Sequence, residues 1–293
     1  MNKSVAVIVS CYNHSPFIKE CLDSLRRQTY KDFAVYFWDN NSSDDSYDLA
    51  EDIVIHSNED DTYLRHICDT TSFDKVLPIG IARWYMVTEE MDEDYIAILD
   101  ADDYWHMDKL SKQMELIERN PDVKLVFTDS YYSHWEEKIA QVENYPIFTE
   151  QKVYDRIDKK TFHDKYPPLM QDPFTNLLTR YNFMPCPSLL FEKKALYDVI
   201  GNPMAYTAAE DYDWVLKMTA KYDCDYVLGA PLVYYRIHEK QLTKRSPWRC
   251  TAEEIDVVKR ARHFRHLTRA ENARVNAHLI KLYMKLIYKE LFK

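Results

Sequence analysis

Three carboxylates stand close together in the segment Asp100-Ala101-Asp102-Asp103, directly after a run of apolar residues. In an extended backbone the side chains of Asp100 and Asp102 point to the same side. Carboxylates this close repel one another unless a cation joins them. Divalent cations such as Mn²⁺ and Mg²⁺ take oxygen ligands and usually keep positions open for substrate phosphates. The spacing favours a divalent-metal site; the alternative is that Asp102 and Asp103 cap a helix that begins near Met107.

Two further polar clusters follow apolar runs. Residues 10–13 come after the run 5–9, and residues 39–44 come after the run 33–38. In open parallel sheets, ligands gather at the carboxyl ends of the strands. We therefore expect both clusters to share one site with residues 100–103.

The apolar patterns predict the elements that must position these clusters. Short apolar runs predict strands at 5–9, 33–38, 95–99, 123–128 and 226–235. Apolar residues at helical spacing predict helices from Ser15-Pro16 to about Gln28, from Ser46, and at 79–90, 107–118 and 213–221. The irregular residues 130–180 predict no element. Alternating strands and helices indicate an α/β fold with a mostly parallel sheet covered on both faces.

The composition excludes several classes of protein. Among 293 residues, 48 Asp and Glu outnumber 38 Lys and Arg, which gives a net charge of −10. This balance argues against nucleic-acid binding, which depends on basic residues that neutralise phosphates. The three glycines, Gly80, Gly201 and Gly229, are far apart in sequence, so a P-loop and a G-x-G-x-x-G turn are excluded.

Cysteine spacing and hydropathy predict the compartment. None of the six cysteines forms a C-x-x-C pair, which favours free thiols in a reducing compartment. The longest early apolar run, residues 5–9, is too short for a signal peptide or a membrane span. We therefore expect a cytoplasmic protein.

The end of the chain differs from the rest in charge. Residues 259–293 contain ten Lys and Arg and two Glu, a net charge of +8, so residues 1–258 carry −18. A broad apolar stripe at helical spacing accompanies this charge: Leu279, Ile280, Leu282, Tyr283, Leu286 and Ile287. The favoured interpretation is a helix docked on the acidic body. The alternative is a basic amphipathic helix on the inner face of an anionic membrane or on a partner subunit.

Five segments, in this order, resemble the motifs of family 2 glycosyltransferases of the GT-A fold. They are VAVIVSCYN at 5–13, DNNSSD at 39–44, LDADDYW at 99–105, EDYDW at 210–214 and PLVYYRIH at 231–238. The resemblance implies a GT-A domain over residues 1–243. Its nucleotide-binding half would cover about 1–129 and its acceptor-side half about 130–243. Residues 244–293 would then form a basic helical extension.

The resemblance also implies residue roles. The metal, Mn²⁺ or Mg²⁺, would be bound by Asp102 and His238, and Asp211 would be the general base. The nucleotide-sugar would contact Tyr12, Asn13, Asp39, Asn40, Arg83, Asp100 and Ala101. Arg83 belongs to this set because Gly80-Ile81-Ala82-Arg83 is the nearest match to a helix start that places a basic residue near the diphosphate. The acceptor pocket would include Glu210 and, unless they are core residues, Trp105 and Trp214.

The implied activity is an inverting transfer of a sugar from a UDP- or dTDP-sugar, UDP being favoured, to a hydroxyl of a glycan or lipid-linked acceptor. Metal-bound charge would stabilise the leaving diphosphate. Two alternatives stay open. A sugar-phosphate nucleotidyltransferase also uses metal-binding aspartates, but the lack of a glycine-rich loop weighs against it. A non-catalytic nucleotide- or glycan-binding domain would not need Asp100, Asp102 and Asp211 together.

Overall fold

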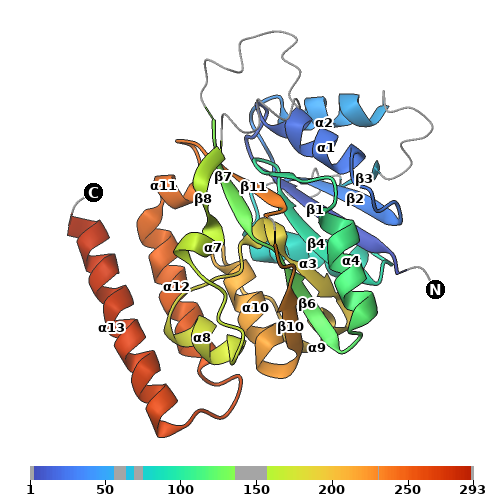
Figure 1. Cartoon of the computed structure of the whole chain (residues 1–293). Coiled ribbons are helices and arrows are strands. Elements are labelled where there is room, and N and C mark those ends of the chain that lie inside the picture. Colours follow the sequence, from blue (N-terminus) through green and yellow to red (C-terminus); the bar gives the residue numbers. More distant parts are fainter. Residues whose placement is uncertain (1–2, 56–63, 69–74, 136–156, 230, 292–293) are drawn as a thin grey trace.

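The computed structural model describes residues 3–55, 64–68, 75–135, 157–229 and 231–291. Its central element is a seven-stranded sheet with the strand order β10-β6-β9-β4-β1-β2-β3 (Figure 1). The strands are β1 (Val5–Cys11), β2 (Phe33–Asp39), β3 (Leu64–Cys68), β4 (Tyr95–Asp100), β6 (Val123–Phe127), β9 (Leu190–Glu192) and β10 (Asp223–Tyr226). All neighbouring pairs are parallel except the two that involve β9. The predicted mostly parallel α/β sheet is confirmed.

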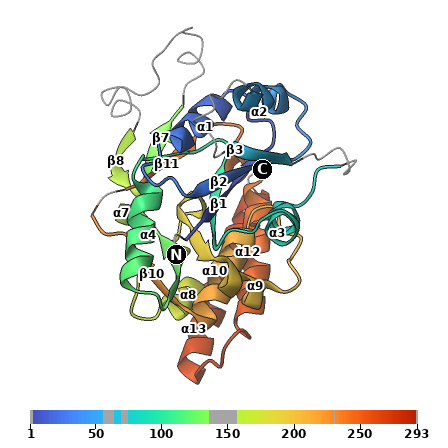
Figure 2. The same cartoon turned by 90° about the vertical axis from the view of Figure 1, so that its right-hand side faces the viewer.

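Helices cover both faces of this sheet, because strand β1 has apolar side chains on both sides. Every residue of β1 is buried, with Val7 and Val9 in the core on one face and Ala6 and Ile8 in the core on the other. The first face carries α1 (Ile18–Arg26), α2 (Ser46–Ile55) and α4 (Lys109–Arg119). The second carries α3 (Ile79–Glu89), α9 (Lys193–Ile200) and α10 (Glu210–Lys221). Figure 2 shows α4 and α3 on opposite sides of β1 and β2.

The start of α1 differs from the prediction. The helix begins at Ile18, after a turn, and the predicted cap Ser15 does not hold its first turn. Instead the backbone N–H of Ser15 donates to Oδ2 of Asp44 at 3.1 Å. This bond ties the loop after β1 to the loop after β2.

A second, four-stranded sheet stands beside the carboxyl end of β4. Its strand order is β5-β11-β7-β8, with β5 (Tyr104–Trp105), β11 (Val233–Ile237), β7 (Ser130–His134) and β8 (Ile157–Thr161). The single late strand predicted at 226–235 is therefore wrong. Two strands, β10 and β11, occupy different sheets, and Gly229 with φ 105 lies between them. A left-handed residue of this kind ends a strand and favours glycine.

Strand β9 joins the two sequence halves of the sheet. Leu190 pairs with Ala97 of β4 on one side and with Val126 of β6 on the other. Both pairings are antiparallel. Residues from the expected acceptor-side half thus complete the sheet of the expected nucleotide-binding half.

The C-terminal segment forms α12 (Pro247–Ala261) and α13 (Arg269–Leu291), which lie side by side at one edge of the molecule (Figure 1). Val275, Leu279 and Leu282 of α13 are buried in the core of the body. Docking on the body, the favoured interpretation, is confirmed for this face. The opposite face leaves Ile280 and Ile287 at 61% and 55% exposure. Within the part of the chain that the structure describes, no helix has the length and apolar character needed to cross a bilayer.

Candidate active site

The three predicted polar clusters lie at one edge of the large sheet. Strand register brings them together, because Cys11 at the end of β1 pairs with Asp39 of β2, and Ser10 pairs with Asp100 of β4. The backbone continues the contact, since the N–H of Ala101 donates to the carbonyl of Ser10 at 2.9 Å. The side chain of Ala101 is fully buried, so it can meet a ligand only through its backbone.

Asn13 and Asn40 shape the loops rather than pointing their amides outward. Asn13 has a φ of 58°, and its Oδ1 accepts from the N–H of Ser43 at 2.7 Å. Asn40 exchanges two hydrogen bonds with the backbone of Leu77, at 2.8 and 2.9 Å. Both amides therefore fix the position of the neighbouring loops. A nucleotide contact through the Asn40 amide would have to replace such a bond, whereas the bond of Asn13 occupies only its Oδ1.

Tyr12 and Asp39 each keep a group available to a ligand at this edge. Tyr12 is 38% exposed. Asp39 is 3% exposed, and its Oδ2 accepts from the N–H of Ser42 at 2.8 Å. Its Oδ1 is buried, and no residue that the structure describes donates to it. A buried acceptor without a donor is costly, so this oxygen is well suited to a ligand N–H.

A cluster of two histidines and one aspartate forms the expected metal site. Oδ2 of Asp102 lies 3.0 Å from Nε2 of His238 and 3.7 Å from Nε2 of His14. Burial alone would raise the pKa of Asp102, but His14 and the bond with His238 outweigh it and lower the pKa to about 2. Asp102 is thus a carboxylate at neutral pH. The sequence analysis missed His14, although it directly follows the Tyr12-Asn13 pair at the same sheet edge.

Arg236 holds the loop that carries Asp102. Its buried guanidinium donates to the backbone carbonyl of Asp102 and to the carboxylate of Glu20 in α1. Its backbone N–H donates to Oδ1 of Asp103 at 2.7 Å. The guanidinium also lies over the ring of Phe17, 4.7 Å from the ring centre. The segment YRIH at 235–238 therefore contributes one residue that positions the loop and one, His238, that faces Asp102.

Arg83 connects the two sides of the site. It is 1% exposed and donates to Oδ1 of Asp100, to Oε1 of Glu210 and, at 3.1 Å, to Oγ of Ser10. Arg83 belongs to helix α3, and its guanidinium lies between the carboxyl groups of Asp100 and Glu210. This position does not support the expected diphosphate contact of Arg83. Glu210 likewise turns inward at 5% exposure, which does not support a place in an acceptor pocket.

A glycine allows this arrangement. A Cβ atom at Gly80 would lie 2.8 Å from the carbonyl oxygen of Met204 and 3.0 Å from Cβ of Glu210. Real Cβ atoms do not approach backbone oxygens so closely, so any side chain at this position would push α3 away from α10. Gly80 therefore keeps Arg83 within reach of Glu210.

Asp211 stands at the start of α10, next to Glu210. The helix N-cap is Ala209, so neither acidic residue caps the helix. Burial raises the pKa of Asp211 to about 6 and also raises that of Glu210, and the adjacent Arg83 counteracts both shifts. A carboxyl group with a pKa near 6 suits proton abstraction at neutral pH.

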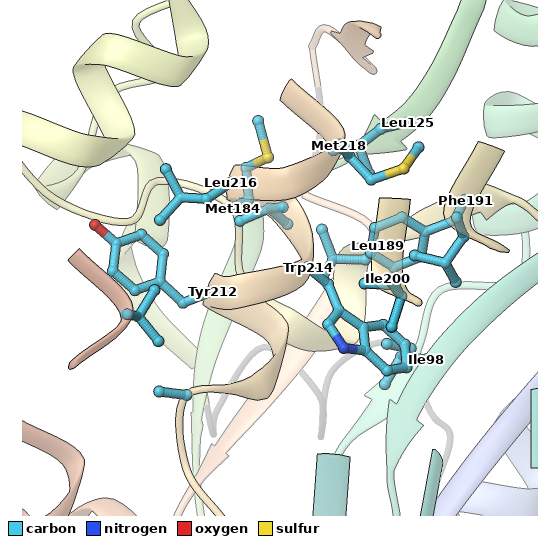
Figure 3. Packing of buried hydrophobic residues seen from close by; sticks show 14 of the residues in the cluster. Ile98, Leu125, Met184, Leu189, Phe191, Ile200, Tyr212, Trp214, Leu216 and Met218 are labelled. Atoms are coloured by element: carbon cyan, nitrogen blue, oxygen red, sulfur yellow. The ribbon is translucent and has the colours of Figure 1, made fainter. Parts of the chain in front are cut away.

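Both tryptophans of the expected acceptor pocket are core residues. Trp214 is 1% exposed and packs with Phe191 and Ile200 in the core beneath the sheet (Figure 3). Trp105 is 2% exposed, and its indole N–H donates to the carbonyl of Pro187 at 2.8 Å. Of the two interpretations left open for these residues, the structure therefore supports the core.

Comparisons with known proteins identify glycosyltransferases as relatives of this chain. The amylovoran biosynthesis glycosyltransferase AmsB of Erwinia amylovora is 34% identical over 116 residues, covering 40% of this chain and 36% of that protein. The UDP-Glc:alpha-D-GlcNAc-diphosphoundecaprenol beta-1,3-glucosyltransferase WfaP of Escherichia coli is 31% identical over 129 residues, covering 44% of this chain and 45% of that protein. The matched region thus spans less than half the length of either relative.

A solved structure shows the same fold. The TarS fragment of S. aureus in complex with UDP superposes with a TM-score of 0.62 at 16% identity, covering 94% of this chain and 70% of that one. The GT-A-like architecture expected from the motifs is thereby confirmed. The family model described as glycosyl transferase family 2 matches residues 6–178, more than half of the sequence. The chain belongs to glycosyl transferase family 2.

Proposed function

We propose that this protein transfers a sugar from a UDP-sugar to a hydroxyl of a glycan or lipid-linked glycan, with inversion at the anomeric carbon. The observation that carries the proposal is the position of Arg83. It binds Asp100, on the donor side, and Glu210, directly before the candidate base Asp211. One buried guanidinium thus holds the two halves of a two-sided site together.

Recognition of the nucleotide falls to Tyr12 and Asp39. The exposed ring of Tyr12 offers a stacking surface for a base. Oδ1 of Asp39, which has no donor among the described residues, accepts a hydrogen bond from the N3–H of a uracil ring, and cytosine has no hydrogen at N3. The UDP bound to TarS and the UDP-glucose in the name of WfaP support this choice of donor.

The residues around Asp102 fit a divalent ion, because two imidazoles and a carboxylate with a low pKa face one another. His238 and Asp102 would hold the ion, and His14 lies beside them. When bound, such an ion stabilises negative charge on a leaving diphosphate. Asp103, buried beneath, holds the loop through its bond with the N–H of Arg236.

Asp211 removes the proton from the attacking hydroxyl. The acceptor oxygen forms a bond to the anomeric carbon while the bond from that carbon to the diphosphate oxygen breaks. The electron pair of that bond stays with the diphosphate, and the proton passes to the Asp211 carboxylate. Attack on the face opposite the leaving group inverts the anomeric configuration.

The test is the assay of purified protein with a panel of nucleotide sugars and Mn²⁺. We expect UDP release from a UDP-sugar, with transfer when a suitable acceptor is present. Release of pyrophosphate in a parallel assay with nucleoside triphosphates and sugar 1-phosphates would identify a nucleotidyltransferase instead. Binding of UDP without turnover on any donor and acceptor would indicate a non-catalytic domain.

We also propose that the exposed face of α13 contacts an anionic membrane surface at which a lipid-linked acceptor would lie. Residues 1–258 carry −18, so an anionic surface repels the body and attracts only the tail. Ile280, Met284 and Ile287 are exposed on α13; Lys281 lies beside them, and Arg274 is exposed nearer the start of the same helix. This combination of apolar and basic side chains is typical of interfacial helices. The diphosphoundecaprenol in the name of WfaP supports an acceptor of this kind.

A further inference from the structure

His14 lies beside the pair of Asp102 and His238, and neither the family motifs nor the proposed reaction gives it a task. Its Nε2 is 3.7 Å from Oδ2 of Asp102. Its ring meets the ring of His238 edge-on, with 6.0 Å between the ring centres. One ligand atom from each of the three residues lies within 4.8 Å of the other two.

These separations suit a single ion. Two ligands at about 2.1 Å from one metal are at most about 4.2 Å apart. The distances of 3.0 and 3.7 Å from Asp102 to the two imidazoles fall within this limit. The third separation, between the two imidazoles, is at most 4.8 Å and so exceeds this limit by up to about 0.6 Å. Rotation of one imidazole ring toward the ion would close this gap.

In the described part of the chain, no residue forms a hydrogen bond with the His14 ring. Its Nδ1 is buried and has no partner there, whereas its backbone N–H donates to Oγ of Ser46 at 2.9 Å. The loop is thus fixed through the backbone while the imidazole faces Asp102. Among the described residues, no hydrogen bond therefore competes with an ion for Nε2, the ring nitrogen that faces Asp102.

We infer that His14 is a third protein ligand of the ion, so that His14, Asp102 and His238 bind one first-row divalent metal before any nucleotide arrives. The inference rests on the proposed function, because it assigns the ion of that site. A site with one or two carboxylate ligands relies on substrate phosphates to complete its coordination. Three protein ligands form a site of their own and still leave positions open for diphosphate oxygens.

The chemistry of the three ligand atoms also determines which metal the site prefers. Two imidazole nitrogens and one carboxylate oxygen favour first-row transition ions over Mg²⁺, which takes oxygen ligands and dehydrates reluctantly. We therefore expect Mn²⁺ to bind the nucleotide-free protein and a large excess of Mg²⁺ to leave it bound.

The experiment is a titration of the full chain with Mn²⁺ in the absence of nucleotide. Calorimetry and the decrease of the EPR signal of free Mn²⁺ both measure binding. Pulsed EPR of the bound ion then counts the coordinated imidazole nitrogens. For the wild type we expect one Mn²⁺ per chain and two imidazoles. His14→Ala and His14→Gln should each leave one imidazole and weaken Mn²⁺ binding by at least about tenfold, the lower end of the effect of losing even an outer-shell partner.

The matched control is His134→Ala. His134 also faces an aspartate, Asp158, at 2.9 Å, but this pair is about half exposed and lies outside the cluster. Its removal should leave Mn²⁺ affinity and the imidazole count unchanged. Thermal unfolding without metal checks that each variant is folded, and an increase of the unfolding temperature on addition of Mn²⁺ is expected for the wild type and the control only.

The results of these experiments can contradict the role of His14 without contradicting the proposed function, and the reverse. A single imidazole in the wild type, or Mn²⁺ binding only after UDP is added, would overturn the role of His14 even if the protein transfers sugar. Two imidazoles on a bound ion would support it even if no donor were turned over. Equal Mn²⁺ affinity in the wild type and both folded His14 variants would also overturn it.

Discussion

Asp102 and His238 lie 136 residues apart in sequence, yet their side chains are 3.0 Å apart at the edge where the two sheets meet. Asp102 follows strand β4 of the large sheet, and His238 follows strand β11 of the small sheet. Neither strand alone forms the site. The candidate site therefore depends on how firmly the two sheets are joined, which directs several of the tests below.

Asp211→Asn removes the candidate base with little change in size. We expect the rate of sugar transfer to fall by about 10²–10⁴-fold, the usual contribution of a general base, while UDP binding is kept. Calorimetry with UDP and an assay of UDP release measure the two properties. Glu290→Gln, on the exposed side of α13, serves as the control. Transfer at the wild-type rate by Asp211→Asn would remove Asp211 from the mechanism.

The pH profile tests the same residue in the unmodified protein. Burial raises the pKa of Asp211 to about 6, and only the deprotonated form accepts a proton. We therefore expect kcat/KM to be constant above the pKa and to fall about tenfold per pH unit below pH 6. UDP affinity measured over the same range separates this loss from weaker donor binding. A profile that stays flat down to pH 4.5 would contradict the assignment.

Arg83→Met leaves the buried carboxylate of Glu210 without its cation and removes the partner of Asp100. Breaking a buried ion pair by removing one partner costs about 3–5 kcal/mol of unfolding free energy. We expect a loss of this size in urea unfolding. The control, Arg119→Met, removes an exposed partner of Glu115 and should change stability by less than about 1 kcal/mol. Equal stability of the two variants would show that Arg83 does not hold the site together.

Glu20→Gln tests the support of the metal loop from α1. Glu20 accepts from the guanidinium of Arg236, which in turn donates to the backbone carbonyl of Asp102. Loss of a residue bonded directly to a metal ligand typically weakens metal binding by about 10–100-fold, and Glu20 acts one contact further out, so we expect a loss near the lower end of that range. Calorimetric titration with Mn²⁺ gives the affinity, and Glu118→Gln on α4 is the control. Unchanged affinity in a folded Glu20→Gln protein would show that the loop does not need this contact.

Membrane contact through α13 is tested without disturbing its docked face. Ile280, Met284 and Ile287 are exposed, so changing all three to Ser should preserve the fold and reduce binding to vesicles that contain phosphatidylglycerol. Binding of the wild type should weaken as salt rises, because basic side chains contribute to it. Leu228→Ser, at a side chain 76% exposed elsewhere, is the control. Equal vesicle binding by the triple variant, or concentration-dependent dimerisation without vesicle binding, would contradict the proposal.

Much of this fold could be predicted from the sequence because strand and helix periods are strong local signals. The strands at 5–9, 33–38 and 95–99 and the polar residues that follow them were predicted, and parallel register places their ends together. The error at 226–235 has a local cause. Gly229 and the following Pro231 divide that segment, and a closer interpretation of them as strand-ending residues would have separated β10 from β11.

Other features could not be predicted from local patterns. The three residues of β9 carry too little sequence to reveal an antiparallel strand between β4 and β6. The inward turn of Arg83 depends on Glu210, 127 residues later, and on the close approach at Gly80. Trp105 and Trp214 illustrate the same limit, because an aromatic residue beside a motif packs in the core as readily as it lines a pocket.

The position of β9 sets a condition for engineers who exchange acceptor specificities between enzymes of this fold. A chimera cut near residue 129 would remove β9, the strand that lies between β4 and β6. The backbone N–H and C=O groups of β4 and β6 would then be unpaired and could bind another chain. Grafts should therefore carry the recipient's own segment 186–192 with the first half of the chain. Specificity can then be exchanged through the surrounding loops while the shared sheet stays closed.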